Sequence, residues 1–444
     1  MSTPFESKIE SAVMDYLRDL EALRHMLEPT MYMAEQISID LDKKHLETLE
    51  ENATEKRTEG NSHFFKIPPK KQMKVRQLAK KSERYRTATL LLPRTFLVSF
   101  VSTYDAFLGN LIHALISLQP AILSNSAKQL TYKDLSQFSS MDDARHHMAE
   151  SEVEGVLRKS HSEHFEWLEN TFKVDLRKEL PSWKTFIELT ERRNLFVHNH
   201  GKASSQYFRV CKKHGVDTSQ ISPGDILPAG KDYLENSYRC LFEIGVKLSQ
   251  VFYRKMHSSQ LIDADNLINN IAFELLVDEK HELALTLLTF ATDLKKFGSD
   301  DTRRVLVVNK ALAHKMAGEQ EKCLSTLSRL DWSACSDRFT LCIAVLKDDF
   351  PKAYAVMRRI GRNGDVDDAS YQTWPVFAAI RKEDEFQAVY QEIFGDKSTI
   401  FQTTNDLDAP TPLVHDGERE DSDDSVADAT SSGPLNGNEP NCPG

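Results

Sequence analysis

The sequence predicts an all-α protein. Residues that favour helices dominate long stretches of the 444 residues, whereas the alternating Val, Ile and Thr pattern of strands, bounded by turn residues, is scarce. Apolar residues near the start recur at helical spacing, for example Ile9, Val13 and Leu20. A chain of this length is expected to contain two or three domains and a tail.

The first third of the chain is predicted to form three helical segments. Residues 4–50 have the pattern of one or two amphipathic helices. Residues 50–69 are polar and end in two prolines, which predicts a linker or an exposed loop. A basic helix follows over residues 70–86, and Pro93 is predicted to start a strongly apolar helix over residues 94–118, since proline is tolerated in a first turn.

Three further segments have helical patterns before residue 257. Residues 141–170 are helical in pattern and rich in charge. Pro181 and Ser182 are a start signal for a helix over residues 183–198, with Ser182 as its expected N-cap. A long helix over residues 231–256 carries apolar positions that suit one buried face.

From about residue 258 the pattern changes to short helices joined by tight polar turns. Approximate periods in the thirties are typical of stacked helical hairpins similar to tetratricopeptide arrays. An irregular helical bundle is the alternative, because the repeat is degenerate. The predicted turns are residues 278–280, 318–320, 347–349 and 382–384.

These segments predict four regions. An N-terminal helical extension and linker is followed by a helical bundle, then by the helical-repeat region, and then by an acidic tail rich in Ser, Gly and Pro that is expected to be disordered. The predicted regions are residues 1–69, 70–257, 258–396 and 397–444.

Charge and cysteine content narrow the class of protein. The net charge of −11 is unevenly placed, so it does not exclude nucleic acid as a partner. Six cysteines are scattered without a CxxC pair, which favours a reducing, cytoplasmic setting. The start of the chain has no signal-peptide pattern. The apolar run 90–118 is interrupted by polar residues, which predicts a buried core helix and no membrane association.

The most informative segment is Glu188 to His198, with the sequence E-L-T-E-R-R-N-L-F-V-H. Asn194 and His198 are four residues apart and share a helix face. Arg193 and His198 are five apart, about 140° around the helix. Histidine suits proton transfer near neutrality, and arginine holds phosphate oxygens without losing its charge. Arg-x4-His alone is a weak pattern, which also occurs where a helix end is merely capped by cations.

The surrounding residues make the segment more specific. Glu188, Arg192, Arg193, Asn194 and His198 resemble the E-x-x-x-[KR]-R-N-x-x-x-H signature of the HEPN superfamily, and the helix over residues 96–111 is similar to the first core helix of such domains. The resemblance implies a helical bundle that dimerises through the motif helix and cleaves RNA without a metal ion or cofactor. It assigns phosphate binding to Arg193, proton transfer to His198, orientation to Asn194, and supporting roles to Glu188 and Arg192.

This sequence departs from the family's pattern at one position, and the resemblance leaves an alternative function open. Toxins of the family that are silenced by nucleotidylation carry a tyrosine two residues after the histidine; His200 stands there instead, and Tyr207 is not a positional match. The expected function is an endoribonuclease acting as a homodimer or higher even-numbered oligomer, in the setting of a toxin or an anti-phage defence effector. The alternative is a catalytically inactive HEPN dimerisation adaptor that binds a protein partner or trigger through its helical repeats.

Other candidate sites are weaker. Cations of the basic helix fall broadly on one side and could track an RNA backbone, although a solvated face is the usual meaning of such a run. His161 and His164 have helix spacing but lack further ligands, so no metal site is expected. No phosphate-binding glycine loop or nucleophile elbow is present. The candidate RNA-contacting cations are Lys70, Lys74, Lys81 and Arg84.

Overall fold

The prediction of an all-α fold is confirmed by a computed structural model of the chain. The structure describes residues 7–125, 128–178 and 180–395. Of these residues, 73% are helical and 3% lie in strands, and they belong to one compact unit. The predicted acidic tail, residues 397–444, lies outside the described residues.

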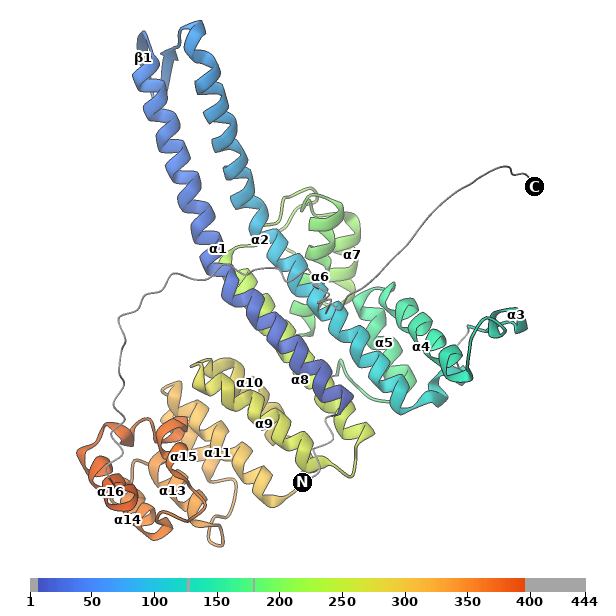
Figure 1. Ribbon diagram of the computed structural model, residues 1–444, viewed down its shortest axis with the longest axis vertical. Helices are drawn as coiled ribbons and strands as arrows, with labels where there is room; N and C mark the ends of the chain where they lie inside the picture. The colour runs from blue at the N-terminus through green and yellow to red at the C-terminus, as the bar shows by residue number, and fades with distance from the viewer. Residues whose placement is uncertain (1–6, 126–127, 179, 396–444) are drawn as a thin grey trace, which may run out of the picture. The chain divides into compact units, whose positions relative to one another are not determined.

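The chain begins with two long helices joined by a small hairpin (Figure 1). Helix α1 spans Lys8–Asn52 and α2 spans Pro69–Leu118. Between them, β1 (Glu55–Glu59) pairs antiparallel with β2 (Ser62–Lys66). The segment expected to be a linker or loop therefore contains an exposed β-hairpin, which turns the chain back so that α2 packs along α1.

The middle of the chain adds helices around α2. The motif helix α6 and the long helix α8 have the bounds that the sequence predicts, whereas the charge-rich segment 141–170 forms two helices. The break falls at Ser160, whose side chain and that of Glu163 form a capping box. The elements are η1 (Pro120–Asn125), α3 (Tyr132–Leu135), α4 (Met141–Leu157), α5 (His161–Phe172), α6 (Trp183–His198), α7 (Ser205–Lys213) and α8 (Lys231–Met256).

The remaining described residues form short helices that follow one another as hairpins. The elements are α9 (Leu261–Val277), α10 (His281–Thr292), α11 (Asp300–Met316), α12 (Gln320–Leu327), α13 (Asp337–Leu346), α14 (Phe350–Ile360), α15 (Asp368–Thr373), η2 (Pro375–Phe377), η3 (Ile380–Lys382) and α16 (Asp384–Phe394).

The polar turns predicted in this region separate helices. Three of them close in the same way. Glu279, Gly318 and Asp348 have φ of 59°, 76° and 58°, and the next amide donates to a carbonyl five residues back in each case. This is the hydrogen bond of a Schellman cap, which ends a helix tightly enough for the next one to return beside it. The fourth predicted turn overlaps the last residue of η3 and the first residue of α16.

Pro93 lies inside α2, so the expectation that it starts a helix is wrong. Proline removes one backbone hydrogen bond from a helix, which packing on both sides of it can offset. Before Pro93, Arg86 of α2 pairs with Asp42 of α1 at 3.0 Å. After it, Phe107 of α2 stacks on Tyr16 of α1 with ring centroids 4.6 Å apart. Both halves of α2 are thus held along one helix.

The main core runs from α1 to α16 and includes the apolar half of α2. Tyr16 is 3% exposed and its hydroxyl donates to the Leu241 carbonyl of α8 at 2.9 Å. Gly245 makes this approach possible, because a Cβ there would lie 2.4 Å from the Tyr16 ring. Among the described helices, α2 alone is long and apolar enough by composition to span a membrane, and 56% of its most apolar window is buried in this core.

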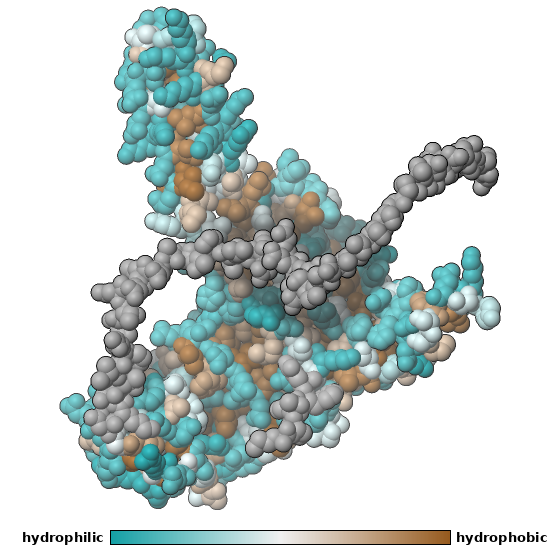
Figure 2. Space-filling model, in the orientation of Figure 1, coloured by the Kyte–Doolittle hydropathy of each residue, from teal (hydrophilic) through white to brown (hydrophobic). Residues whose placement is uncertain are grey.

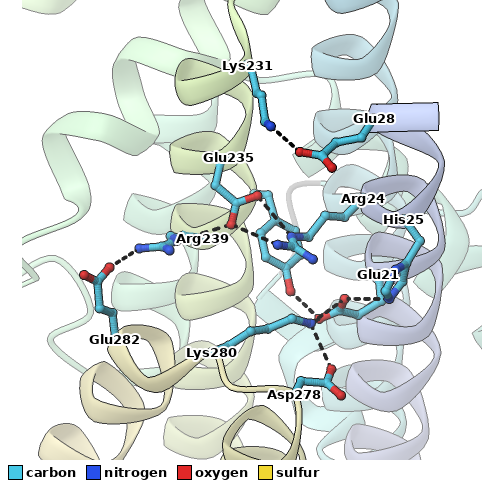
Figure 3. Close-up of polar contacts among 11 residues, drawn as sticks. Glu21, Arg24, His25, Glu28, Lys231, Glu235, Arg239, Asp278, Lys280 and Glu282 are labelled. Carbon is cyan, nitrogen blue, oxygen red and sulfur yellow. Dashed lines mark hydrogen bonds and ion pairs between the residues drawn. The ribbon is translucent and has the colours of Figure 1, made fainter. Parts of the chain in front are cut away.

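A charged network ties α1 to α8 and to the turn between α9 and α10 (Figure 3). Lys280 of that turn donates to both carboxylate oxygens of Glu21 at 2.9 Å. Arg24 donates to Glu235 of α8 at 3.0 Å, and Lys231, the first residue of α8, pairs with Glu28. The network fixes α8, against which the motif helix α6 packs.

Candidate functional site

The predicted site residues lie on α6, which packs against α2, α7 and α8. Phe186, Ile187 and Leu189 bury one face of this helix. Ser182 stands at the N-cap as expected, but its hydroxyl makes no capping hydrogen bond. The final turn is different, since Val197 and His198 are exposed.

The C-terminal end of α6 is held by α2. Arg94 lies over the Phe196 ring at 5.4 Å and donates to the His200 carbonyl at 3.1 Å. His200 and Gly201 have φ of 52° and 81°, so the chain reverses in the left-handed region directly after the helix. These contacts keep the exposed His198 at a fixed helix end. His198 makes no side-chain hydrogen bond or ion pair with other described residues.

Arg193 belongs to a partly buried group that we call the Asp105 cluster: Asp105, His161, Glu191, Arg193 and Asn194. Arg193 Nη2 donates to Asp105 Oδ2 at 3.1 Å, and its Nη1 donates to Asn194 Oδ1 at 3.2 Å. Asp105 Oδ1 is also hydrogen bonded to His161 Nε2 at 3.0 Å. The Arg193 side chain retains 21% exposure. Asp105 and Asn194 therefore hold the guanidinium on its buried side, while part of it faces solvent.

Burial disfavours the charged form of two neighbouring groups. Burial raises the pKa of the Glu191 carboxyl, an effect that His161 and a hydrogen bond from Asn194 partly reverse. Burial, with a smaller contribution from the neighbouring His161, lowers the pKa of His164 to about 4. The His164 side chain is 2% exposed, and neither ring nitrogen has a hydrogen-bond partner among the described residues. Behind Arg193, the site is a low-dielectric environment.

Glu188 and Arg192 form a second buried group on the other side of α6. Glu188 accepts from Arg192 at 2.8 Å, from the Tyr207 hydroxyl at 2.8 Å and from the Tyr233 hydroxyl at 2.7 Å. Arg192 lies over the Tyr233 ring at 4.1 Å and donates to the Pro228 carbonyl. Burial, followed by the Glu188 charge, raises the pKa of both tyrosines. This group clamps α6 to α7 and α8.

The structure brings together some of the predicted residues and separates others. Arg193 and Asn194 are hydrogen bonded to each other, whereas Glu188 and Arg192 form a separate pair. Arg193 and His198 are about 7.5 Å apart along the axis and about 140° around it. A single chain therefore offers one guanidinium and one imidazole on different sides of the same helix end.

Sequence reasoning missed Asp105, His161, Tyr207 and Tyr233 as partners of the motif. Asp105 is an acid within an apolar helix, which is itself a signal, because a buried carboxylate needs a cationic partner. From its spacing to His164 alone, His161 resembles only a fragment of a metal site. Within the described ranges, no group of three or more His, Cys, Asp or Glu side chains is arranged to hold a metal ion.

The predicted RNA-contacting cations lie on the first half of α2. They are exposed and have no ion pair with the described residues. Arg84 is ten residues before Arg94, about 15 Å along the helix, and Lys70 is about 36 Å from it. They therefore lie away from Arg193, and RNA contact by them stays a prediction. The four cations are Lys70, Lys74, Lys81 and Arg84.

The hairpin region contains a cavity of about 280 Å³, at the place where a protein partner was predicted. Asn269, Asn309, Arg338 and Trp374 contribute polar and aromatic groups to its lining, from α9, α11, α13 and the start of η2. Asn309 is 9% exposed and donates to Asn269 at 2.8 Å. The first helices of successive hairpins thus share one concave surface.

Comparison with known proteins finds no similarity: no family model, no characterised protein and no solved structure matches the chain.

Proposed function

We propose that the chain is a metal-independent endoribonuclease of the HEPN type, with its active centre built from α6 of two copies. One observation carries the proposal. The end of α6 presents a solvent-exposed imidazole, His198, and, on another side of the same helix, a half-buried guanidinium, Arg193, that Asp105 and Asn194 orient. Positioned groups of these two types are what cleavage of an RNA phosphodiester needs when no metal is used.

The proposed reaction is an internal transfer. The 2′-oxygen forms a bond to phosphorus and the bond from phosphorus to the 5′-oxygen breaks. One imidazole takes the proton of the 2′-hydroxyl, and a second imidazole gives a proton to the departing 5′-oxygen. Arg193 holds the two non-bridging oxygens while negative charge builds on them. The products are a 2′,3′-cyclic phosphate and a 5′-hydroxyl.

This chemistry needs two histidines, and each chain supplies one at this place. A two-fold dimer in which the α6 ends meet brings two imidazoles and two guanidinium groups to one cleft. The surface around the helix end is suited to contact with a second copy, because Val197 is 49% exposed, and Leu90 and Leu91, one turn before Arg94 on α2, are 70% and 50% exposed.

The test is cleavage of a fluorescent RNA in EDTA by wild type, Arg193→Ala and His198→Ala. Both substitutions are expected to lower the rate at least about a hundredfold. Arg209→Ala and His147→Ala are matched controls, since both side chains are exposed, and should keep the rate. A substrate with a 2′-deoxy sugar at the scissile position should resist cleavage, and product ends should be as written above.

A specific observation favours a second function. Asp105 already pairs with Arg193, so the chain's own carboxylate occupies the place of a phosphate, as suits a catalytically inactive dimerisation adaptor. The adaptor predicts a stable dimer that is inert on RNA both in EDTA and in Mg²⁺. Cleavage that EDTA abolishes would refute both functions.

Under either function, the concave surface of α9, α11 and α13 is proposed to bind a protein partner, as in tetratricopeptide-like repeats. A setting in toxin or phage-defence systems stays a prediction.

A further inference from the structure

The distal parts of α1 and α2 form a two-helix hairpin that we call the arm, residues 29–92. Figure 1 shows it extending beyond the start of α8, with β1 at its tip. Its two helices face each other through buried small and apolar residues, such as Leu41 of α1 and Val75 of α2. Asp42 of α1 accepts hydrogen bonds from Ser82 and Arg86 of α2. These bonds fix the position of one helix along the other.

A second line of apolar residues runs along the outer side of α1. Tyr32, Ile39 and Leu46 are seven residues apart and are 66%, 52% and 48% exposed. Residues at this spacing drift by only about 20° per heptad, so they make one straight stripe, the pattern of a helix that packs against another helix. On α2, Met73 and Leu90 are each 70% exposed. Figure 2 shows a further band of hydrophobic residues between the two arm helices. Two helices do not cover the exposed apolar residues.

The charges of the two arm helices are opposite. Residues 29–52 of α1 hold six Asp or Glu and two Lys, whereas residues 69–92 of α2 hold eight Lys or Arg and one Glu. Among the described residues, Asp42 with Arg86 is the one ion pair that joins these two segments. Most of the opposite charges are therefore not neutralised within one chain, although they lie on neighbouring helices.

We infer that the arm is a self-association surface, on which α1 of one copy packs against α2 of a second copy. A two-fold axis along the arm keeps residues at the same level. Because Asp42 lies beside Arg86 and the helices are antiparallel, the acids at 47–51 of one copy then lie level with the cations around Lys81 of the other. The result is a four-helix bundle that has Tyr32, Ile39 and Leu46 in its interior.

Other partners that could cover the arm fit the observations less well. Pairing α1 with α1 would oppose two acidic segments, and pairing α2 with α2 would oppose two basic ones. An anionic membrane would meet the acids Glu35 and Glu47 beside the stripe. RNA along the α2 cations would leave the apolar stripe of α1 uncovered. A second copy covers the stripe and pairs the charges at the same time.

The test is an exchange of charge between two full-length variants. The first carries Lys74→Glu, Lys81→Glu and Arg84→Glu, which lowers the net charge of residues 69–92 from +7 to +1 and places acids level with the acids at 47–51 of the other copy. The second carries Glu47→Lys, Glu50→Lys and Glu51→Lys, which changes the net charge of residues 29–52 from −4 to +2 while the α2 segment stays basic. Sedimentation velocity at low ionic strength should show a wild-type dimer, two variants whose dimers are each at least about tenfold weaker, equivalent to about 1.4 kcal/mol, and a heterodimer when the variants are mixed.

A second comparison tests the apolar stripe. Ile39→Glu should weaken the dimer at least about tenfold, whereas Met14→Glu, at an exposed apolar position of α1 outside the arm, should not. Circular dichroism checks that each variant is folded. A monomeric wild type, a mixture that forms no heterodimer, or an Ile39→Glu variant that associates normally overturns the inference. Dimers that appear only when a single-stranded RNA probe is added would assign the α2 cations to RNA instead. A monomeric wild type would also contradict the two-copy active centre of the proposed function, whereas variants that form no heterodimer or an Ile39→Glu variant that associates normally would overturn the arm inference alone.

Discussion

His164 gives the clearest quantitative prediction about the support of the site. It lies on α5 and is 2% exposed, with its ring 5.2 Å from that of His161. Burial and then the neighbouring His161 lower its pKa from 6.5 to about 4. Asp105, which also faces this group, opposes the shift only in part. Folding therefore holds His164 in the neutral form at pH values where the unfolded chain would bind a proton.

The sign and size of the effect follow from linkage. A histidine whose folded pKa is depressed contributes stability above its unfolded pKa, and this stability is lost as the pH falls through the folded value. For His164 the window runs from 6.5 down to about 4. At about 1.36 kcal/mol for each pH unit, the loss over this window is about 3 kcal/mol.

The assay is urea unfolding at pH 7 and pH 4 of wild type, His164→Leu and His147→Leu. His147 is exposed on α4 and serves as the matched control. The decrease in unfolding free energy from pH 7 to pH 4 should be about 3 kcal/mol smaller in His164→Leu than in wild type, and unchanged in His147→Leu. Equal decreases in wild type and His164→Leu would show that His164 is not buried in the neutral form.

Three further substitutions test how α6 and the helices around it pack. Glu188→Gln removes the charge shared by Arg192 and two tyrosines and should destabilise the chain by about 2–4 kcal/mol in urea unfolding; a cost below that of the exposed control Glu166→Gln would contradict the buried clamp. Gly245→Ala drives a Cβ into the Tyr16 ring and should cost about 1–3 kcal/mol, unless α1 does not pack there. Pro93→Ala restores a hydrogen bond within α2 and should raise the unfolding free energy by about 1–3 kcal/mol; a lower melting temperature would refute a continuous helix.

Much of the local structure follows from sequence patterns alone. The bounds of α6 and α8 and the turns of the hairpin region match the predictions, because Gly, Pro and polar punctuation act through short-range sterics. Pro93 shows the limit of that rule. Its local signal is a helix start, but residues on both sides pack against α1, which lies tens of residues away in sequence. Tertiary packing therefore overrides the local preference.

The candidate site likewise contains residues that sequence patterns predict and residues that they do not. Residues contributed by one helix, such as Arg193, Asn194 and His198, could be found from their spacing. Asp105 and His161 could not be assigned as partners of Arg193, since they are 88 and 32 residues before it and only the packing of α2 and α5 brings them there. Tyr207 is not at the position of the tyrosine that some family members carry, yet its hydroxyl donates a hydrogen bond to Glu188. Spacing within one helix predicts neighbours, whereas contacts between helices depend on the whole fold.

The central claim, a site shared by two copies, is tested most directly with mixed dimers. Wild-type chains and Arg193→Ala/His198→Ala chains with different tags are co-expressed, and dimers that contain one of each are isolated through both tags. Their cleavage of RNA in EDTA is compared with that of wild-type dimers. A shared site predicts that the mixed dimers lose at least about a hundredfold in rate, because each cleft lacks one imidazole and one guanidinium. Mixed dimers that retain half of the wild-type rate would show that each chain works alone and would contradict the account.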